Sequence, residues 1–219
     1  MIHIHNVSKR YRLHGCEHTV LDRINLTVHP GERLGILGRN GSGKSTLVRL
    51  ISGAEPPTEG FIRRDMRVSW PLAFSGGFQG YLSGFDNLRF ICRIYDVPFE
   101  DKLEYVEDFS ELGKYMREPV RFYSSGMRAR LAFALSMVID FDCYLIDEVV
   151  AVGDARFRDK CQKELFEKRG HKAMIIVSHE PSFIEKHCKD TAVIVKGKLR
   201  AFSNVDEGFA YYREHAEEQ

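Results

Sequence analysis

Nine consecutive residues have the clearest chemical meaning in this chain. They read Gly38-Arg39-Asn40-Gly41-Ser42-Gly43-Lys44-Ser45-Thr46, so that Gly-Lys-Ser follows a glycine and four spacer residues. Glycines at these positions allow backbone angles that expose consecutive N–H groups to an anion. We expect Lys44 to reach the β- and γ-phosphates of a nucleotide and the Ser45 hydroxyl to hold Mg²⁺. The run therefore predicts a phosphate-binding loop in which Gly38 and residues 40–46 contact the nucleotide.

Two acidic residues follow an apolar run farther along the chain. Residues 143–146 read Cys-Tyr-Leu-Ile, and Asp147 and Glu148 come directly after them. We expect Asp147 to support Mg²⁺, through a water molecule, because phosphate-loop enzymes use a second carboxylate in this way. Glu148 is expected to orient or deprotonate a water that attacks the γ-phosphate. An isolated Asp-Glu pair is equally often a solvated turn, so this interpretation depends on the phosphate-binding loop.

Two further motifs can be interpreted only together with the phosphate-binding loop and the acidic pair. Ser124, Ser125 and Gly126 precede an apolar pattern of helical spacing, which predicts a capped helix start and a second phosphate site. His179 follows the apolar run 175–177 and one serine, so it is predicted at the carboxyl edge of the same sheet. Alone, a serine cap or a histidine after a strand is usually structural. The order of the four features along the chain favours a functional set.

The elements that must position these residues predict an α/β fold. Residues 33–37 are an apolar strand after the turn Pro30-Gly31, and helical spacing begins after the phosphate-binding loop. Residues 55–60 are predicted to form a turn, with a solvated basic edge at Arg63, Arg64 and Arg67. From Tyr81 to Ile139 the pattern is helical and aromatic-rich. Strands are predicted again over 143–147, 175–178, 192–195 and 199–201, before an amphipathic helix from Asp206.

In this order of motifs the chain resembles the nucleotide-binding subunit of ATP-binding-cassette (ABC) transporters over nearly its whole length. The resemblance implies one domain, residues 1–219, with a RecA-like phosphate-loop core, a mixed sheet and an N-terminal antiparallel β subdomain. It places the catalytic core at about residues 1–80 and 140–219, and a helical subdomain with the signature segment at about 81–139. It also implies ATP and Mg²⁺ as cofactors.

The resemblance assigns roles to residues that the motifs above leave open. Tyr11 matches the aromatic residue that stacks on adenine, and Gln79 matches the glutamine that contacts Mg²⁺ and the attacking water. Asp154 ends the loop 151–154 that crosses between subunits, and His179 matches the switch histidine of the γ-phosphate. Residues 123–127 match the signature segment. They depart from its usual Leu-Ser-Gly-Gly-Gln at Tyr123, Ser125 and Met127, and Val149 replaces the usual proline after the glutamate.

These departures indicate a branch of the family. Tyr-Ser-Ser-Gly-Met at 123–127 and the segment 147–157 resemble bacterial surface polysaccharide exporters, the polysaccharide and polyol phosphate branch. Residues 69–82 resemble the capsular polysaccharide exporters most. The alternatives are export of O-antigen or teichoic acid. Related O-antigen exporters often carry a carbohydrate-binding domain after the cassette, and we expect none here because Gln219 follows His179 too closely.

The resemblance also implies partners. A second copy would close head to tail over ATP, and a separate polytopic membrane permease would take up the motion. The aromatic residues Phe85, Phe90, Tyr95 and Phe99 are candidates for the permease-docking surface, although they could equally form the core of the helical subdomain. We expect a peripheral protein at the cytoplasmic face of the inner membrane.

Composition agrees with this interpretation. The formal net charge is +1, which indicates neither a nucleic-acid-binding surface nor an acidic tail. Five scattered cysteines without a Cys-x-x-Cys motif favour reduced thiols over disulfides or zinc. No apolar run approaches the roughly 20 residues that span a bilayer, and the N-terminus does not resemble a signal peptide.

Two other classes share the phosphate-binding loop. A soluble phosphotransferase should lack the signature helix and the switch histidine. A cassette ATPase of DNA repair would need long coiled coils between Ser45 and Ser124, where the sequence leaves no room for them. A translation factor of the same family would carry two cassettes in one chain, and this sequence shows one.

Overall fold

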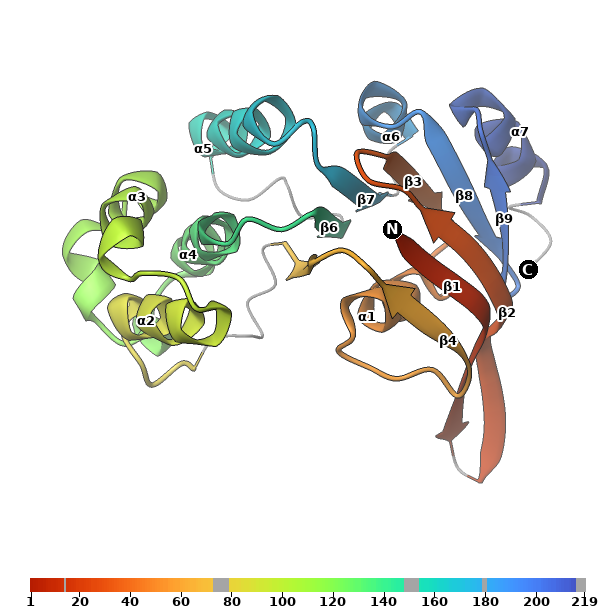
Figure 1. Cartoon of the computed structure of the whole chain (residues 1–219), viewed down its shortest axis with the longest axis horizontal. Helices are drawn as coiled ribbons and strands as arrows, with labels where there is room; N and C mark the ends of the chain where they lie inside the picture. Colours follow the sequence, from red (N-terminus) through yellow and green to blue (C-terminus); the bar gives the residue numbers. More distant parts are fainter. Residues whose placement is uncertain (14, 73–78, 148–153, 179–180, 216–219) are drawn as a thin grey trace. The chain divides into compact units, whose positions relative to one another are not determined.

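The computed structural model describes residues 1–13, 15–72, 79–147, 154–178 and 181–215. The chain divides into two units (Figure 1). The first comprises Met1–Pro71, Phe141–Glu148 and Lys168–Gln219, and the second comprises Leu72–Asp140 and Val149–Glu167. Each unit is therefore built from segments that are distant in the sequence.

A six-stranded sheet forms the centre of the first unit. Its strand order is β5 (Val68–Pro71), β6 (Cys143–Asp147), β7 (Ala173–Val177), β3 (Arg33–Leu37), β8 (Asp190–Val195) and β9 (Lys198–Phe202). The first five strands are parallel, and β9 pairs antiparallel with β8. Every residue of β7 is buried, as expected for a parallel strand covered on both faces. The α/β fold predicted from the apolar runs is confirmed, and so is the mixed sheet that the family resemblance implied.

A smaller antiparallel sheet completes the β structure of this unit. Its order is β2 (Cys16–Val28), β1 (Ile2–Leu13) and β4 (Glu59–Arg64). The turn predicted over 55–60 ends at Thr58, because Glu59 and Gly60 already belong to β4. Gly60 has a φ of +77°, and a Cβ there would come within 2.3 Å of the Asn6 carbonyl oxygen. Only glycine allows β4 to approach β1 this closely, and local sequence patterns do not reveal that contact.

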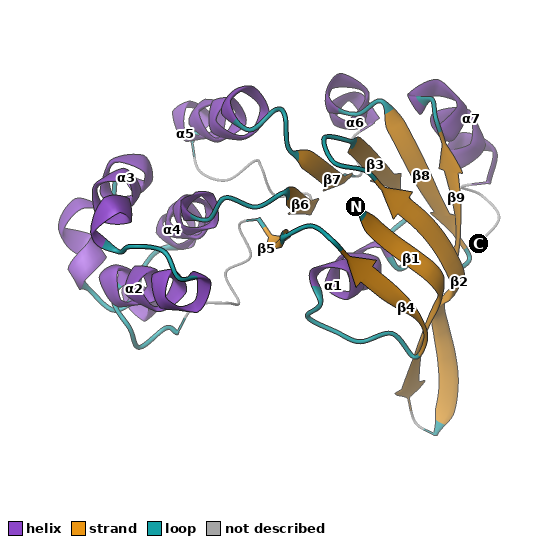
Figure 2. Cartoon of the chain, in the orientation of Figure 1, coloured by secondary structure: helices purple, strands orange, loops and turns teal. Residues whose placement is uncertain are grey.

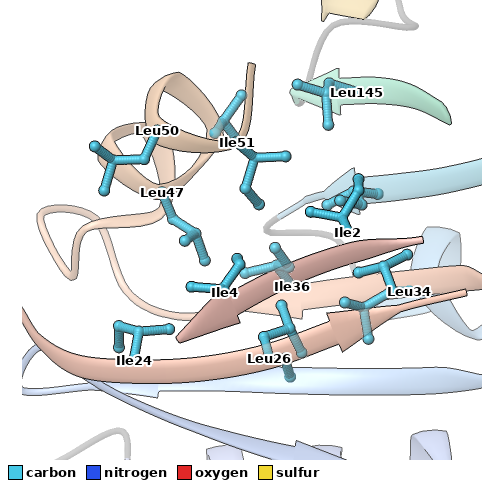
Figure 3. Close-up of a cluster of buried hydrophobic side chains, with 14 of the residues drawn as sticks. Ile2, Ile4, Ile24, Leu26, Leu34, Ile36, Leu47, Leu50, Ile51 and Leu145 are labelled. Carbon is cyan, nitrogen blue, oxygen red and sulfur yellow. The ribbon is translucent and has the colours of Figure 1, made fainter. Parts of the chain in front are cut away.

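Side chains on alternate residues of β3 build two different layers. Leu34 and Ile36 enter an apolar cluster with α1 (Lys44–Ser52) and the antiparallel sheet. Gly35 faces the opposite side, where its position lies against Ile184 of α6 (Pro181–His187). Helix α7 (Val205–His215) covers the same side, with Gly208 against Thr191 of β8. Figure 3 shows the apolar cluster, which includes Ile2, Ile4, Ile24, Leu26, Leu34, Ile36, Leu47, Leu50, Ile51 and Leu145.

The second unit is helical in its described part (Figure 2). Its elements are α2 (Gly84–Tyr95), α3 (Glu100–Ser110), 3₁₀ helices at Gly113–Arg117 and Val120–Phe122, α4 (Ser125–Val138) and α5 (Ala155–Gln162), which continues as a π-helix at Lys163–Lys168. The helical pattern predicted between Tyr81 and Ile139 is confirmed. Within the described ranges, no helix is both long enough and apolar enough to cross a membrane.

Candidate functional site: a phosphate-binding loop and its companions

The phosphate-binding loop joins the end of β3 to the start of α1 in the first unit. Gly41 and Gly43 have φ values of +84° and +108°, which only glycine adopts easily. Gly43 is the N-cap of α1, and no side chain caps this end. Because the first N–H groups of a helix have no intrahelical partner, they and the helix dipole form an anion site.

Neighbouring side chains leave no room for larger residues in this loop. A Cβ at Gly43 would lie 2.8 Å from Leu21 Cδ2, and one at Gly38 would lie 2.5 Å from Ser42 Oγ. The Ser42 hydroxyl is buried and has no hydrogen-bond partner among the described residues. An unsatisfied buried hydroxyl is costly, and a phosphate oxygen in the loop would satisfy it. The loop therefore fits a phosphate ligand.

Three polar side chains of α1 complete the loop. The Lys44 side chain lies over it, since Lys44 Nζ donates to the carbonyl oxygens of Gly38 at 2.7 Å and Arg39 at 3.0 Å. The predicted Mg²⁺ ligand Ser45 is exposed. Thr46 is buried, and its hydroxyl accepts a hydrogen bond from Arg49 at 3.2 Å.

The strand register places Asp147 level with the end of β3. In the sheet, Val177 of β7 pairs with Asp147 on one side and with Ile36 on the other. Parallel strands bring their carboxyl ends to one edge, where ligands bind. A carboxylate and a serine hydroxyl suit Mg²⁺, which typically takes few protein ligands together with phosphates. No cluster of three or more metal-binding His, Cys, Asp or Glu side chains occurs in the described part of the chain.

Two predicted catalytic residues, Glu148 and His179, lie outside the described residues. Their strands end one and two residues earlier, β6 at Asp147 and β7 at Val177. Their roles stay predictions.

Tyr11, the predicted adenine contact, belongs to a charged network that joins β1 to α1 and to the loop that follows α1. Its hydroxyl donates to Glu55 Oε2 at 2.9 Å, and the ammonium of Lys9 lies 5.1 Å from its ring centre. Lys9 also pairs with Glu55 at 2.9 Å, and Arg49 pairs with the same carboxylate at 3.3 Å. Burial acts to raise the pKa of Glu55, but the hydrogen bonds from Lys9 and Tyr11 outweigh it and lower that pKa. The sequence did not reveal this network, because Glu55 lies in a loop without any motif.

The signature segment forms the start of α4 in the second unit. Ser124 is the N-cap, and its hydroxyl accepts a hydrogen bond from the Met127 N–H at 3.2 Å. Ser124 and Ser125 are exposed, and a Cβ at Gly126 would meet only the Ser124 hydroxyl, at 3.9 Å. Tyr123, where the family usually has leucine, is 3% exposed, and its hydroxyl donates to the carbonyl of Tyr115. The predicted helix cap is confirmed, and its first turn is open to a ligand.

The remaining two site residues are also in the second unit. Asp154 is the N-cap of α5 and accepts a hydrogen bond from the Phe157 N–H at 2.9 Å, which lowers the pKa of Asp154. Arg130 of α4 donates to Asp154 Oδ2 at 2.7 Å, so an ion pair joins the signature helix to α5. Gln79 is exposed, and the side chain of Asn87 holds its backbone. Nothing in the sequence pattern had singled out Arg130 or Asn87.

The four aromatic residues considered for a docking surface or for the core of the helical subdomain differ in their exposure. Of the four proposed docking residues, Phe90 is exposed, and Phe85, Tyr95 and Phe99 are half-buried. Cationic side chains cover two of these half-buried rings, Arg117 at Phe85 and Arg89 at Phe99. Among the described residues of this unit, the exposed large apolar side chains are Tyr81, Leu82, Phe90, Ile94, Tyr115 and Phe122.

The sequence of the chain is similar to those of known proteins. A family model described as "ABC transporter" matches residues 21–151. The chain is 58% identical over 212 residues to "Capsule polysaccharide export ATP-binding protein CtrD" of Neisseria meningitidis serogroup B, which covers 97% of this chain and 98% of that protein. It is 56% identical over 214 residues to "ATP-binding protein BexA" of Haemophilus influenzae, covering 98% and 99%. It is 42% identical over 217 residues to "Polysialic acid transport ATP-binding protein KpsT" of Escherichia coli, covering 97% and 96%.

Solved structures share the fold. A dimeric structure of the ATP-binding cassette MJ0796, described as a post-hydrolysis state bound to ADP and Pi, superimposes with a TM-score of 0.78. The match covers 92% of this chain and 98% of that chain at 19% identity. At this identity the likeness establishes the fold alone.

Proposed function

The chain belongs to the ABC transporter family, and we propose that it is the ATP-hydrolysing subunit of a transporter that exports capsular polysaccharide. The observation that supports this cargo assignment is the 58% identity, over nearly the whole of both chains, to a protein named for capsule polysaccharide export. A relative named for polysialic acid transport, 42% identical, also matches along nearly its whole length. Polysialic acid is itself an anionic polysaccharide, so both names point to the same class of cargo.

Other surface polymers are supported less well. One relative named for teichoic acid export is 40% identical over 197 residues and 74% of its own length, and another is 34% identical over 233 residues and 88% of its own length. A relative named for O-antigen export is 40% identical, and the match covers 46% of that protein. The higher identity and fuller coverage favour capsule export. The family membership gives no support to a soluble phosphotransferase.

We assign the two units the roles of a catalytic core and a helical subdomain. Gly38, residues 40–46 and Tyr11 would hold ATP, while Ser45, Gln79 and Asp147 would hold Mg²⁺. Bound Mg²⁺ would neutralise charge on the phosphates and polarise the scissile bond. Glu148 would orient the attacking water and accept its proton, and His179 would contact the γ-phosphate. The buried Ser42 hydroxyl and the uncapped start of α1 support the nucleotide assignment.

The second phosphate site supports a head-to-tail pair of copies. Ser124, Ser125 and Gly126 of one copy would close over the nucleotide of the other, with Asp154 at the same interface. The exposed first turn of α4 provides N–H groups for this contact, because only the Met127 N–H is capped by the Ser124 side chain. The dimeric cassette of the same fold supports such a pair.

Exposed aromatic residues of the second unit support the proposal that the chain binds a membrane protein. The Arg121 guanidinium lies 4.8 Å from the ring centre of Tyr81 and 4.7 Å from that of Phe122, and both rings are largely exposed. Aromatic and arginine side chains are enriched in the centres of protein interfaces. We infer that these residues dock a separate polytopic permease, which would hold the chain at the cytoplasmic face of the inner membrane.

A test in cells separates the cargo from the ATPase chemistry. In a capsule-forming host that carries only the Lys44→Ala variant, we expect polymer synthesis to continue while the surface capsule disappears. Polysaccharide should accumulate in the cytoplasm, as seen by immunogold labelling. The variant Arg63→Ala, which changes an exposed basic residue of β4, is the matched control and should export normally. A normal surface capsule in the Lys44→Ala strain would overturn the cargo assignment.

A further inference from the structure

Asn87 is a buried polar residue of α2 whose side chain bonds to the backbone of the Gln79 segment. It is 2% exposed, and its Oδ1 accepts a hydrogen bond from the Gln79 N–H at 3.1 Å. Its Nδ2 lies within hydrogen-bond distance of the carbonyl oxygens of Gln79 at 3.3 Å, Leu82 at 3.4 Å and Ser83 at 2.9 Å. One amide therefore bonds to both backbone groups of Gln79, whose carbonyl oxygen also accepts a hydrogen bond from the Leu82 N–H at 2.9 Å.

Helix capping does not account for this side chain. Ser83 is the N-cap of α2, and its hydroxyl accepts a hydrogen bond from the Asp86 N–H at 3.1 Å. The start of the helix is thus capped without Asn87. A buried amide is retained only where its hydrogen bonds are made, and here these bonds fix the segment that carries Gln79.

The Gln79 segment is paired in turn with the segment that leads to the signature. The Arg121 N–H donates to the Gly80 carbonyl at 2.8 Å, and the Val120 N–H donates to the Leu82 carbonyl at 2.9 Å. Ser83 and Pro119 form an antiparallel bridge. We call residues 79–83 and 119–123 the paired segments. They join Gln79 at one end to the residue before Ser124 at the other.

Close packing leaves the paired segments little freedom to slide. A Cβ at Gly84 would lie 2.9 Å from the Tyr123 hydroxyl oxygen and 2.9 Å from Met116 Sδ. The buried Tyr123 ring therefore rests directly on the first turn of α2, and its hydroxyl is bonded to the Tyr115 carbonyl. Packed groups of this kind move together and do not deform independently.

We infer that Asn87 is a positioning residue that fixes Gln79 relative to Ser124 through the paired segments. This inference rests on the proposed function, in which Gln79 meets Mg²⁺ in its own copy and Ser124 meets the partner's nucleotide. A shift of Gln79 at one nucleotide is then passed to the phosphate site offered to the other nucleotide. Asn87 acts through Gln79 and touches no substrate itself.

Steady-state ATP hydrolysis by the purified chain tests this role. We expect Asn87→Ala to lower kcat about 10-fold and to raise the Mg²⁺ concentration for half-maximal rate, because loss of a supporting hydrogen bond typically costs 10–100-fold. The Hill coefficient for ATP should fall towards 1, while the KM for ATP changes less than kcat. The double variant Asn87→Ala/Gln79→Ala should be no slower than Gln79→Ala alone.

Matched variants separate the possible outcomes. Ser136→Ala removes a buried hydroxyl that bonds the Ala132 carbonyl within α4, and it should leave the Mg²⁺ dependence unchanged. If Gln79→Ala has no effect, the role proposed for Gln79 is wrong. If Gln79→Ala is impaired while Asn87→Ala behaves like Ser136→Ala, the inference is overturned.

A second variant covers the case in which Asn87→Ala does not fold. Asn87→Asp keeps the shape and the acceptor for the Gln79 N–H, but it loses the donor to the Gln79, Leu82 and Ser83 carbonyls. We expect a smaller change in kcat and in Mg²⁺ dependence, in the same direction as for alanine. Wild-type values in folded Asn87→Asp protein would also overturn the inference.

Discussion

Backbone geometry restricts three positions of the phosphate-binding loop to glycine, and this requirement makes the loop recognisable in the sequence. Gly41 and Gly43 occupy positive φ values, and Gly38 has no space for a Cβ. Asn87 could not be predicted in this way. Its partner Gln79 is eight residues away, and an asparagine in a helix carries no signal about which backbone group it will meet.

His187 at the end of α6 shows how burial changes the chemistry of one side chain. Burial, together with the positive charges of Lys186 and Arg33, lowers the pKa of His187 to about 4 from its ordinary value near 6.5. Between these pH values the unfolded chain binds the proton more tightly than the folded chain. The contribution of His187 to stability is therefore complete above pH 6.5 and is lost as the pH falls towards 4.

The variant His187→Gln tests this pH dependence, because glutamine does not titrate. We expect the wild type to lose roughly 1–2 kcal/mol more unfolding free energy than the variant between pH 7 and pH 5. Urea unfolding at both pH values gives this difference. Parallel losses in the two proteins would show that His187 is protonated in the folded state.

Elements could be predicted where local pattern determines them. The apolar runs of β3, β6 and β7 and the helical spacing after the loop matched the structure. Which strands pair with one another could not be predicted from the sequence. β4 joins β1 in the small sheet, while β5 joins β6 across a long stretch of sequence, and no local pattern encodes such partners.

The contacts of Arg64 with the end of α1 could not be predicted from the sequence either. The sequence interpretation placed it with Arg63 on a solvated edge, but its guanidinium donates to the carbonyl oxygens of Ile51 at 2.7 Å and Leu50 at 2.5 Å. These carbonyls belong to the last turn of the helix that begins in the phosphate-binding loop. The positive charge of Arg64 also interacts favourably with the negative end of the helix dipole.

Replacing Arg64 should therefore cost more than replacing its neighbour. We expect Arg64→Ala to lower the unfolding free energy by about 1 kcal/mol, because it removes charged hydrogen bonds at a helix end. Arg63→Ala removes an exposed pair with Asp65 and should change it by less than about 0.5 kcal/mol. Chemical denaturation of the two variants gives the comparison. Equal effects would show that Arg64 does not stabilise α1.

At the scale of the whole molecule, the site residues are divided between the two units. The phosphate-binding loop and Asp147 belong to the first, and Gln79, Ser124 and Asp154 belong to the second. The sequence interpretation drew the boundaries differently: it assigned Ser124 to the helical subdomain at about 81–139, but Gln79 and Asp154 to the catalytic core at about 1–80 and 140–219. The exposed rings of Tyr81 and Phe122 were not predicted, since exposure depends on how helices pack and not on residue type.

We propose that ATP hydrolysis by this chain drives export of a polysaccharide. It is tested most directly in inverted inner-membrane vesicles that contain the transporter and its lipid-linked polymer. Export in such vesicles moves the polymer into the lumen, where it is protected from an added polysaccharide-degrading enzyme. We predict ATP-dependent protection with the wild-type chain and none with Glu148→Gln at equal amounts of protein. Equal protection with Glu148→Gln, or without ATP, would show that ATP hydrolysis by this chain does not drive the export.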